Sequence, residues 1–199
     1  MIILGLTGSI GMGKSTTAAF FKKYGIAVYS SDEAVHELYL EEPALSLIEA
    51  AFPNTVINGE VSRQNLSSYV VGNSDNLKKL EAIIHPLVRK KEQDFIKLHQ
   101  DNCEKLVVLD IPLLFETGGE SRVDKIAVVS APYDIQRTRV LARENMSEEK
   151  FAAILKRQMP DSEKRASADF IIDTSQGLIA AEQAVQNIIK TLTENTKNA

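Results

Sequence analysis

The sequence predicts an α/β fold in which helices cover both faces of a parallel sheet. Short apolar runs alternate with helical patterns at both ends of the chain, as in β-α-β units. The runs "LVVL" and "IAVV" are continuously apolar, which is typical of strands buried on both faces. A glycine-rich stretch follows the first apolar run and predicts a tight turn between a strand and a helix.

The N-terminal elements follow the order strand, helix, strand, helix. The apolar run 2–7 predicts a buried strand, and 14–24 predicts a helix that Gly25 ends. A second strand is expected over 26–30 and a helix over 33–41. The strand–helix–strand connection should be right-handed, because nearly all parallel crossovers are.

Helical patterns dominate the middle of the chain, from Pro43 to about Asn102, and no strong strand signal appears there. The stretch "VINGEVSR" has turn chemistry and little else. We expect His85-Pro86 to separate two helices, because proline disfavours helix in the residue before it. The block reads as a helical insertion between strands of one sheet.

The C-terminal half returns to strand and helix patterns. Ser147 is the expected N-cap of one helix, since its hydroxyl can accept from a backbone N–H group in the first turn. Strands are predicted at 105–114, 124–132 and 169–174, and helices at 133–145, 147–158 and 178–194.

The composition excludes several classes of protein. The net charge of −4 argues against a general nucleic-acid binder, and no apolar run reaches the roughly 20 residues of a membrane helix. Cys103 is the single cysteine, which excludes an intrachain disulfide and fits a reducing cytoplasm. We therefore expect a cytoplasmic protein without nucleic-acid or membrane partners. The histidines and Cys103 show no metal-ligand spacing, so no structural zinc is expected. A monomer is also expected, although no sequence feature fixes the oligomeric state.

Basic residues concentrate in one part of this acidic chain. Residues 137–165 carry eight Lys or Arg against five Asp or Glu. Such a local excess suggests an anionic ligand. A solvated helix face is the alternative, and charge alone does not decide between them.

The strongest motif is "GSIGMGKS" at Gly8–Ser15, a full match to G-x-x-x-x-G-K-[S/T] between a strand and a helix. Its glycines let the backbone curl so that N–H groups point at phosphate oxygens. The lysine can reach the β- and γ-phosphates, and the serine offers a hydroxyl to Mg²⁺. The predicted nucleotide-binding residues are Gly8, Gly11, Met12, Gly13, Lys14, Ser15 and Thr16.

Three classes of P-loop protein compete: a small-molecule kinase, a GTPase switch, and an ATPase motor or binding module. The two further motifs of a GTPase are missing from the sequence. Asp110, at the end of "LVVLD", is a candidate metal-side carboxylate, although a buried structural aspartate is an equal alternative. A kinase also needs an acceptor-binding insertion and a basic lid, and Arg139 and Arg143 lie four residues apart on a predicted helix.

The chain resembles the dephospho-CoA kinase family along its whole length. The matching features are "GLTGSIGMGKST" (5–16), "SSD" (30–32), "GEVSR" (59–63), "LEAIIHP" (80–86), "IPLLFE" (111–116), Gln136, Arg139, Arg143, Gln158 and "ADFIID" (168–173). The resemblance implies a P-loop kinase-type three-layer fold with a parallel sheet, a helical acceptor-binding insertion and a helical lid. It places a nucleotide-binding core at 1–33, 103–136 and 166–199, the dephospho-CoA-binding insertion at 34–102 and the lid at 137–165.

The same resemblance implies transfer of the ATP γ-phosphoryl group, with Mg²⁺, to the ribose 3′-hydroxyl of dephospho-CoA. Another nucleoside or nucleotide kinase, or less favourably a GTP-hydrolysing switch, is the alternative. The implied catalytic residues are Asp32, Lys14, Arg139 and Arg143; the implied substrate-binding residues are Asp32, Arg63 and His85; Ser15 and Asp110 are assigned to the metal.

Two positions depart from the family pattern. Ser30 stands where relatives have the first Asp of a D-A-D motif, and Thr174 stands where relatives often have Asn. Asp32 itself suits either a helix N-cap or catalysis. We predict that catalysis is its main role and that Ser31 shares the capping.

Overall fold

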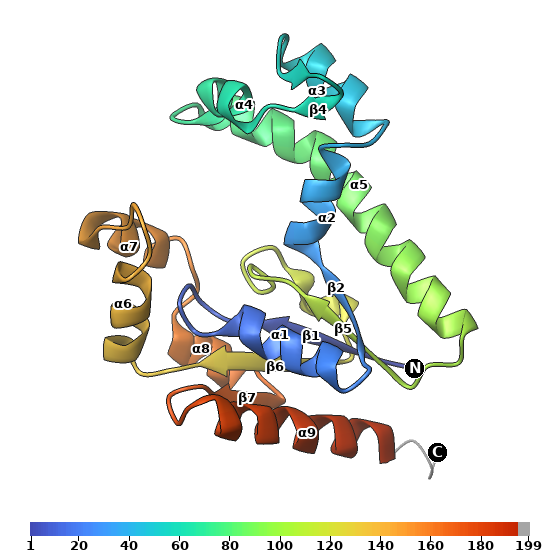
Figure 1. Cartoon of the computed structure of the whole chain (residues 1–199), viewed down its shortest axis with the longest axis vertical. Coiled ribbons are helices and arrows are strands. Elements are labelled where there is room, and N and C mark those ends of the chain that lie inside the picture. Colours follow the sequence, from blue (N-terminus) through green and yellow to red (C-terminus); the bar gives the residue numbers. More distant parts are fainter. Residues whose placement is uncertain (195–199) are drawn as a thin grey trace. The chain divides into compact units, whose positions relative to one another are not determined.

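The computed structural model describes residues 1–194 and divides into two compact units. The first unit consists of Met1–Tyr29 together with the chain from His99 onward, and the second is the continuous stretch Ser30–Leu98. Figure 1 shows the elements of both units.

The first unit is built on a five-stranded sheet with the order β2-β5-β1-β6-β7. Parallel pairing joins β5 to β1, β1 to β6 and β6 to β7, which confirms the predicted parallel sheet. The strands are β1 (Ile2–Thr7), β2 (Ala27–Ser30), β5 (Leu106–Asp110), β6 (Lys125–Ser130) and β7 (Phe170–Asp173).

Both faces of this sheet are covered. Leu106 and Val108 belong to a core shared with helices α1 (Lys14–Lys23) and α9 (Leu178–Glu194), which lie side by side in Figure 1. Val107, which alternates with them and therefore points to the opposite face, is also fully buried. This explains why the runs "LVVL" in β5 and "IAVV" in β6 are apolar at every position.

Three further helices of the first unit differ in part from the sequence prediction. They are α6 (Tyr133–Leu141), α7 (Glu148–Leu155) and α8 (Asp161–Ala166), and a 3-10 turn, η1, spans Gly119–Arg122. The Ser147 hydroxyl accepts from the Lys150 N–H, as predicted for an N-cap. The prediction that Arg139 and Arg143 share one helix was wrong, because α6 ends before Arg143.

The second unit holds four helices and a hairpin around its own apolar core. Sequence patterns missed the hairpin of β3 and β4, whose two-residue turn Asn58-Gly59 has positive φ at both positions, as type I′ turns require. The elements are α2 (Ser31–Leu38), α3 (Ala44–Ala51), β3 (Val56–Ile57), β4 (Glu60–Val61), α4 (Arg63–Val70) and α5 (Ser74–Asp101).

Helix α5 continues through Pro86, so the expected break at His85-Pro86 was wrong. A proline inside a helix removes one hydrogen bond and costs about 3 kcal/mol or more. The apolar stripe, however, runs unbroken across it. Leu80 and Ile84 before the proline and Leu87 after it all pack in the core of the second unit. Burial of this stripe on both sides of Pro86 offsets the local penalty.

Glu49 organises the turn between α3 and the hairpin. Its carboxylate accepts hydrogen bonds from the N–H groups of Asn54, Thr55 and Val56, at 2.7, 3.0 and 2.8 Å. The N–H groups of Val56 and Asn54 hold the pKa of Glu49 below its usual value, because they stabilise the charged form.

We expect Glu49 to make the second unit acid-sensitive. Because its pKa is lowered in the folded state, its contribution to stability is present above the unfolded pKa and is lost as the pH falls through the folded pKa. Glu49→Gln should therefore lower stability to urea at pH 7 and flatten the loss of stability below about pH 4.5.

Urea unfolding followed by circular dichroism between pH 3 and pH 7 measures this effect. Glu81→Gln, a change at an exposed residue of α5, serves as the matched control. Equal acid sensitivity of Glu49→Gln and the unaltered protein would show that the carboxylate does not stabilise the turn.

Candidate functional site

The glycine-rich loop leads from β1 into the first turn of α1, as the motif predicts. A Cβ atom at Gly8 would lie 2.6 Å from the carbonyl oxygen of Val129, so only glycine fits against β6. Gly11 has φ +78, which favours glycine, and a Cβ there would lie 2.5 Å from a methyl group of Val140 in α6. The loop is thus pressed between β6 and α6.

Lys14 and Asp110 form an ion pair beside this loop. The Lys14 Nζ lies 2.5 Å from the Asp110 Oδ1, and both side chains are largely buried. Asp110 is the last residue of β5 and is paired in register with Leu6 of β1. Strand pairing therefore brings a carboxylate to the lysine of the phosphate loop, at the edge of the sheet where ligands of open α/β folds bind.

Thr174 connects the loop to Arg139. The Thr174 hydroxyl donates to the carbonyl of Met12 at 2.8 Å. The Arg139 guanidinium donates to the Thr174 hydroxyl and to the Thr174 carbonyl, both at 2.8 Å. The residue that departs from the family pattern thus holds an arginine of α6 against the segment that follows β7.

A cavity of about 300 Å³ joins these elements within the first unit. Two glycines of the phosphate loop, both predicted arginines and the start of α9 line it. Its lining residues are Gly11, Gly13, Thr16, Thr17, Phe20, Arg139, Arg143, Thr174, Gly177, Leu178 and Ala181. The cavity therefore brings two loop glycines together with Arg139 and Arg143.

The remaining loop residues differ in what their side chains do. Ser15 and Thr16 lie exposed in the first turn of α1. Met12 is 2 % exposed, and its sulfur accepts from the Ala131 N–H, so its side chain belongs to the core.

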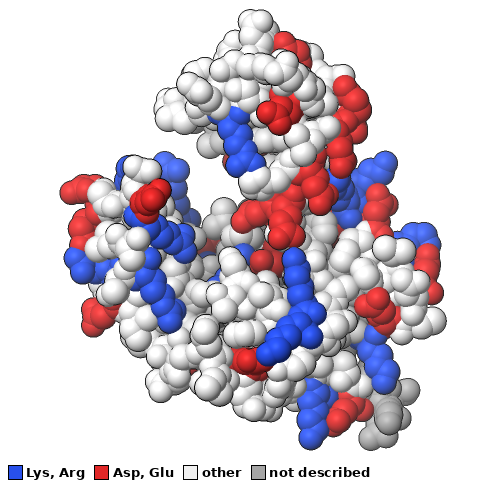
Figure 2. Space-filling model, viewed as in Figure 1, with Lys and Arg blue, Asp and Glu red and all other residues white. Residues whose placement is uncertain are grey.

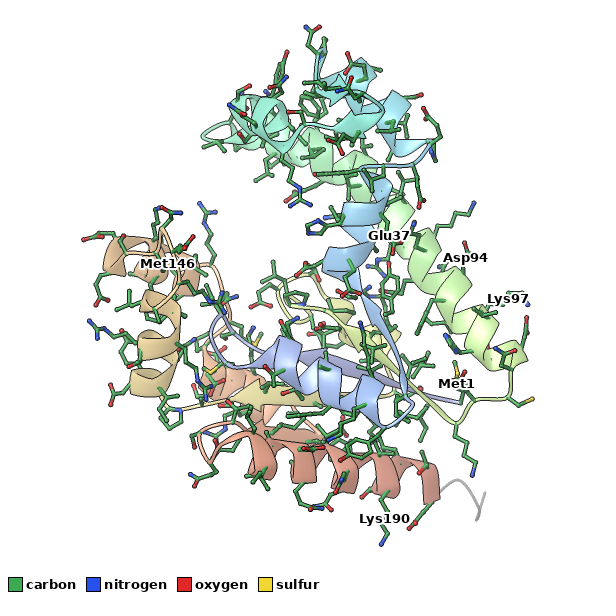
Figure 3. The ribbon with its side chains drawn as sticks, in the orientation of Figure 1. Met1, Glu37, Asp94, Lys97, Met146 and Lys190 are labelled. Carbon is green, nitrogen blue, oxygen red and sulfur yellow. The ribbon has the colours of Figure 1, made fainter. Side chains whose placement is uncertain are left out.

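Part of the charge in 137–165 is paired with carboxylates. Figure 2 shows Lys and Arg interspersed with Asp and Glu over α6 and α7, and Figure 3 labels Met146 in the turn between these helices. Arg137 forms an ion pair with Glu148 across them. A solvated face therefore explains Arg137, whereas Arg139 and Arg143 line the cavity.

At the end of β7, Asp173 has a pKa held below its usual value by hydrogen bonds from Ser175 and by the nearby charges of Arg165 and Arg139. It stays ionised at neutral pH and keeps negative charge close to Arg139.

In the second unit, Ser30 is the N-cap of α2, and its hydroxyl accepts from the Glu33 N–H at 3.2 Å. Ser31 is the first helical residue, so the expectation that it shares the capping was wrong. Asp32 lies exposed in the first turn without being the cap residue. Its carboxylate is therefore not needed at the N-cap position.

Arg63 and His85 also belong to the second unit but differ in their surroundings. Arg63 is the first residue of α4, and its guanidinium contacts the ring of His36, a residue for which the sequence gave no signal. His85 is exposed in the middle of α5.

Lys91 of α5 pairs with Glu41 and with Glu37, which Figure 3 labels on α2.

Within residues 1–194, no group of three or more His, Cys, Asp or Glu side chains could hold a metal ion. In the same part of the chain, no helix combines the length and the apolar character needed to cross a membrane.

Comparison with known proteins places the chain in one family. The family model described as dephospho-CoA kinase matches residues 2–180. A dephospho-CoA kinase from Mesorhizobium japonicum is 59% identical over 192 residues, covering 96% of this chain and 97% of the relative. One from Bartonella henselae is 56% identical over 195 residues, covering 98% and 100%.

Solved structures agree with this result. A protein from Thermus thermophilus matches with a TM-score of 0.81 and 35% identity, covering 96% of this chain and 98% of its own. The dephospho-CoA kinase from Campylobacter jejuni matches with a TM-score of 0.75 and 26% identity, covering 98% of each chain. A shikimate kinase from Aquifex aeolicus, at 15% identity and a TM-score of 0.52, shares the fold. The phosphate loop, its lysine–carboxylate pair and these matches over nearly the whole chain lead to one conclusion: the chain belongs to the dephospho-CoA kinase family.

Proposed function

We propose that this kinase transfers the γ-phosphoryl group of ATP to the ribose 3′-hydroxyl of dephospho-CoA. One observation carries the proposal. The family model spans residues 2–180, which include both the phosphate loop and the whole of the second unit. The products are coenzyme A and ADP.

The nucleotide is bound by the phosphate loop and the cavity beside it. Backbone N–H groups of the loop and the N-terminus of α1 favour the negative charge of the phosphates. Lys14, Arg139 and Arg143 neutralise the charge that spreads over the γ-phosphoryl oxygens during transfer. Catalysis by these residues is thus mainly electrostatic.

Ser15 and Asp110 are the proposed ligands of Mg²⁺. They fit the ion, because Mg²⁺ is usually held by one or two protein oxygens together with water and substrate phosphates. Asp110 is already part of the loop environment through its contact with Lys14. When bound, Mg²⁺ supplies further neutralisation of the phosphates.

Asp32, Arg63 and His85 form the proposed acceptor side. Asp32 orients the 3′-hydroxyl and accepts its proton. The hydroxyl oxygen forms a bond to the γ-phosphorus, while the bond between this phosphorus and the β–γ bridging oxygen breaks and ADP leaves. Arg63 provides a cation for a substrate phosphate, and His85 contacts the same ligand.

The wider organisation of the enzyme follows from this assignment. We assign residues 1–33, 103–136 and 166–199 to the nucleotide-binding core, 34–102 to dephospho-CoA and 137–165 to a lid that excludes water from the reacting groups. The enzyme acts as a cytoplasmic monomer. Size-exclusion chromatography with light scattering tests the oligomeric state.

A coupled ADP-release assay tests the function itself. ADP formation from ATP should require dephospho-CoA, and nucleoside monophosphates should not replace it. ADP formed equally well without an acceptor would favour a nucleotide-hydrolysing switch instead. ADP formed only with a nucleoside or nucleotide would favour another small-molecule kinase.

Two neighbouring substitutions separate catalysis from helix capping. Asp32→Asn should lower turnover by about 100-fold or more, because it removes the proton acceptor, and should leave thermal stability unchanged. Ser30→Ala removes the cap hydroxyl and should cost about 0.5–2 kcal/mol of stability with little loss of turnover.

Steady-state rates and thermal unfolding of both variants provide the comparison. Near-normal turnover together with lower stability in Asp32→Asn would assign Asp32 to the fold rather than to the reaction.

Asp110→Asn tests the metal assignment. The asparagine can still accept from Lys14 but loses the charge that attracts Mg²⁺, so the Mg²⁺ concentration for half-maximal rate should rise about tenfold. Asp124→Asn is the matched control, since Asp124 accepts from the Ile3 N–H near the start of β1. An unchanged Mg²⁺ requirement in Asp110→Asn would limit this residue to its contact with Lys14.

A further inference from the structure

Two glutamines bind the same residue of the phosphate loop. The side-chain Nε2 of Gln136 donates to the carbonyl of Ile10 at 2.7 Å. The side-chain Oε1 of Gln158 accepts from the N–H of Ile10 at 3.1 Å. A backbone carbonyl can only accept and a backbone N–H can only donate, so the chemistry of Ile10 fixes which end of each amide it meets.

The glutamines come from the two ends of residues 133–160, here called the 133–160 segment. Gln136 is 3 % exposed and lies near the start of α6, the helix that begins directly after Pro132. Gln158 follows α7 and comes two residues before Pro160. Both points where this segment joins the sheet region therefore contact one loop residue.

The position of Gln158 is itself held in place. The N–H of the next residue, Met159, donates to the Glu116 carboxylate at 2.8 Å. The same carboxylate oxygen lies 2.8 Å from the Nζ of Lys164, whose side chain is fully buried. Despite the cost of burial, these two partners keep the pKa of Glu116 below its usual value. Gln158, which accepts from the Ile10 N–H, therefore lies next to a residue that Glu116 holds in position.

Ile10 occupies a turn whose central peptide can take two orientations. The Met12 N–H donates to the Ser9 carbonyl at 3.2 Å, which closes a four-residue turn. Gly11, at its third position, has φ +78, as type II turns require. Type I and type II turns differ in the direction of the peptide between their second and third residues. In this turn, that peptide carries the Ile10 carbonyl and the Gly11 N–H.

The bond from Gln136 therefore determines where the Gly11 N–H points. A peptide group is planar, and its carbonyl and N–H point in opposite directions. Holding the Ile10 carbonyl toward Gln136 turns the Gly11 N–H away from it. Gly11 lines the cavity with Arg139, so the orientation of this peptide affects the loop surface beside the cavity. Gln158 fixes the preceding peptide through the Ile10 N–H.

We propose that Gln136 and Gln158 are positioning residues that hold the phosphate loop in its binding orientation before the nucleotide arrives. They act on polyphosphate binding through Ile10 rather than by touching the ligand. The inference rests on the proposed function only in requiring that the loop binds a nucleoside triphosphate.

Calorimetric titration with ATP and AMP, without acceptor, measures this effect. Gln136→Leu and Gln158→Leu keep the side-chain size but lose the amide. Each should weaken ATP binding about 3- to 10-fold and AMP binding less than 2-fold, because ATP places more phosphate on the loop. Gln183→Leu, at an exposed position of α9, is the matched control and should change neither affinity.

Glutamate substitutions show whether a weaker ATP affinity reflects lost positioning of Ile10 or a general effect of altered side-chain charge or volume. Gln158→Glu retains an acceptor for the Ile10 N–H, so it should bind ATP more tightly than Gln158→Leu. Gln136→Glu points a carboxylate at the Ile10 carbonyl, so it should bind ATP more weakly than Gln136→Leu. Added charge alone would make glutamate the worse substitution at both positions.

The outcomes separate this inference from the proposed function. If the unaltered protein does not bind ATP, the proposed function fails. If it binds ATP but the leucine variants weaken ATP and AMP equally, or if glutamate and leucine rank in the same order at both positions, the positioning role is overturned. Thermal unfolding of each variant shows that the comparison is made on folded protein. Gln158 is partly exposed, so Gln158→Leu and Gln158→Glu should disturb packing less than the variants of Gln136.

Discussion

A phosphate-binding loop must point several N–H groups toward one place, and groups that converge in this way cannot satisfy one another. Such a loop needs partners from outside itself. Here they come from four separate parts of the chain: Asp110 meets Lys14, Thr174 meets the Met12 carbonyl, and Gln136 and Gln158 meet Ile10. The order β2-β5-β1-β6-β7 brings these parts to one edge of the sheet.

The features that the sequence predicted well are those written in short stretches. Gly8–Ser15 is a continuous motif, and the apolar strands are continuous runs, so the loop and the parallel sheet could be located directly. Local rules failed where distant packing decided the outcome. Pro86 suggested a helix break, but the apolar stripe on both sides of it keeps α5 intact. Asn58-Gly59 was a usable hairpin signal that the surrounding helical patterns obscured.

In the candidate site too, single residues could be predicted from short stretches of sequence, whereas the contacts between them could not. Lys14 and Asp110 could be named individually, since each lies at the end of a recognisable strand or motif. Their contact depends on the order of the strands in the sheet, which cannot be deduced from a single sequence. The partners of Arg139 are even less visible, because Thr174 lies 35 residues away and was noticed only as a departure from the family pattern. The cap at Ser30 depends on the hydroxyl orientation at one residue, one position before the predicted one.

The insertion of Ser30–Leu98 into the first unit also has a consequence for synthesis on the ribosome. A nascent chain that ends at residue 98 contains the whole second unit, including its apolar core. It contains neither neighbour of β1, because β5 begins at Leu106 and β6 at Lys125. The central strand of the nucleotide-binding sheet is therefore made first but has no partner strand until the chain has passed the whole second unit. Until then its apolar side chains and unpaired backbone groups stay open to other contacts, which is the general hazard of sheets built from distant segments.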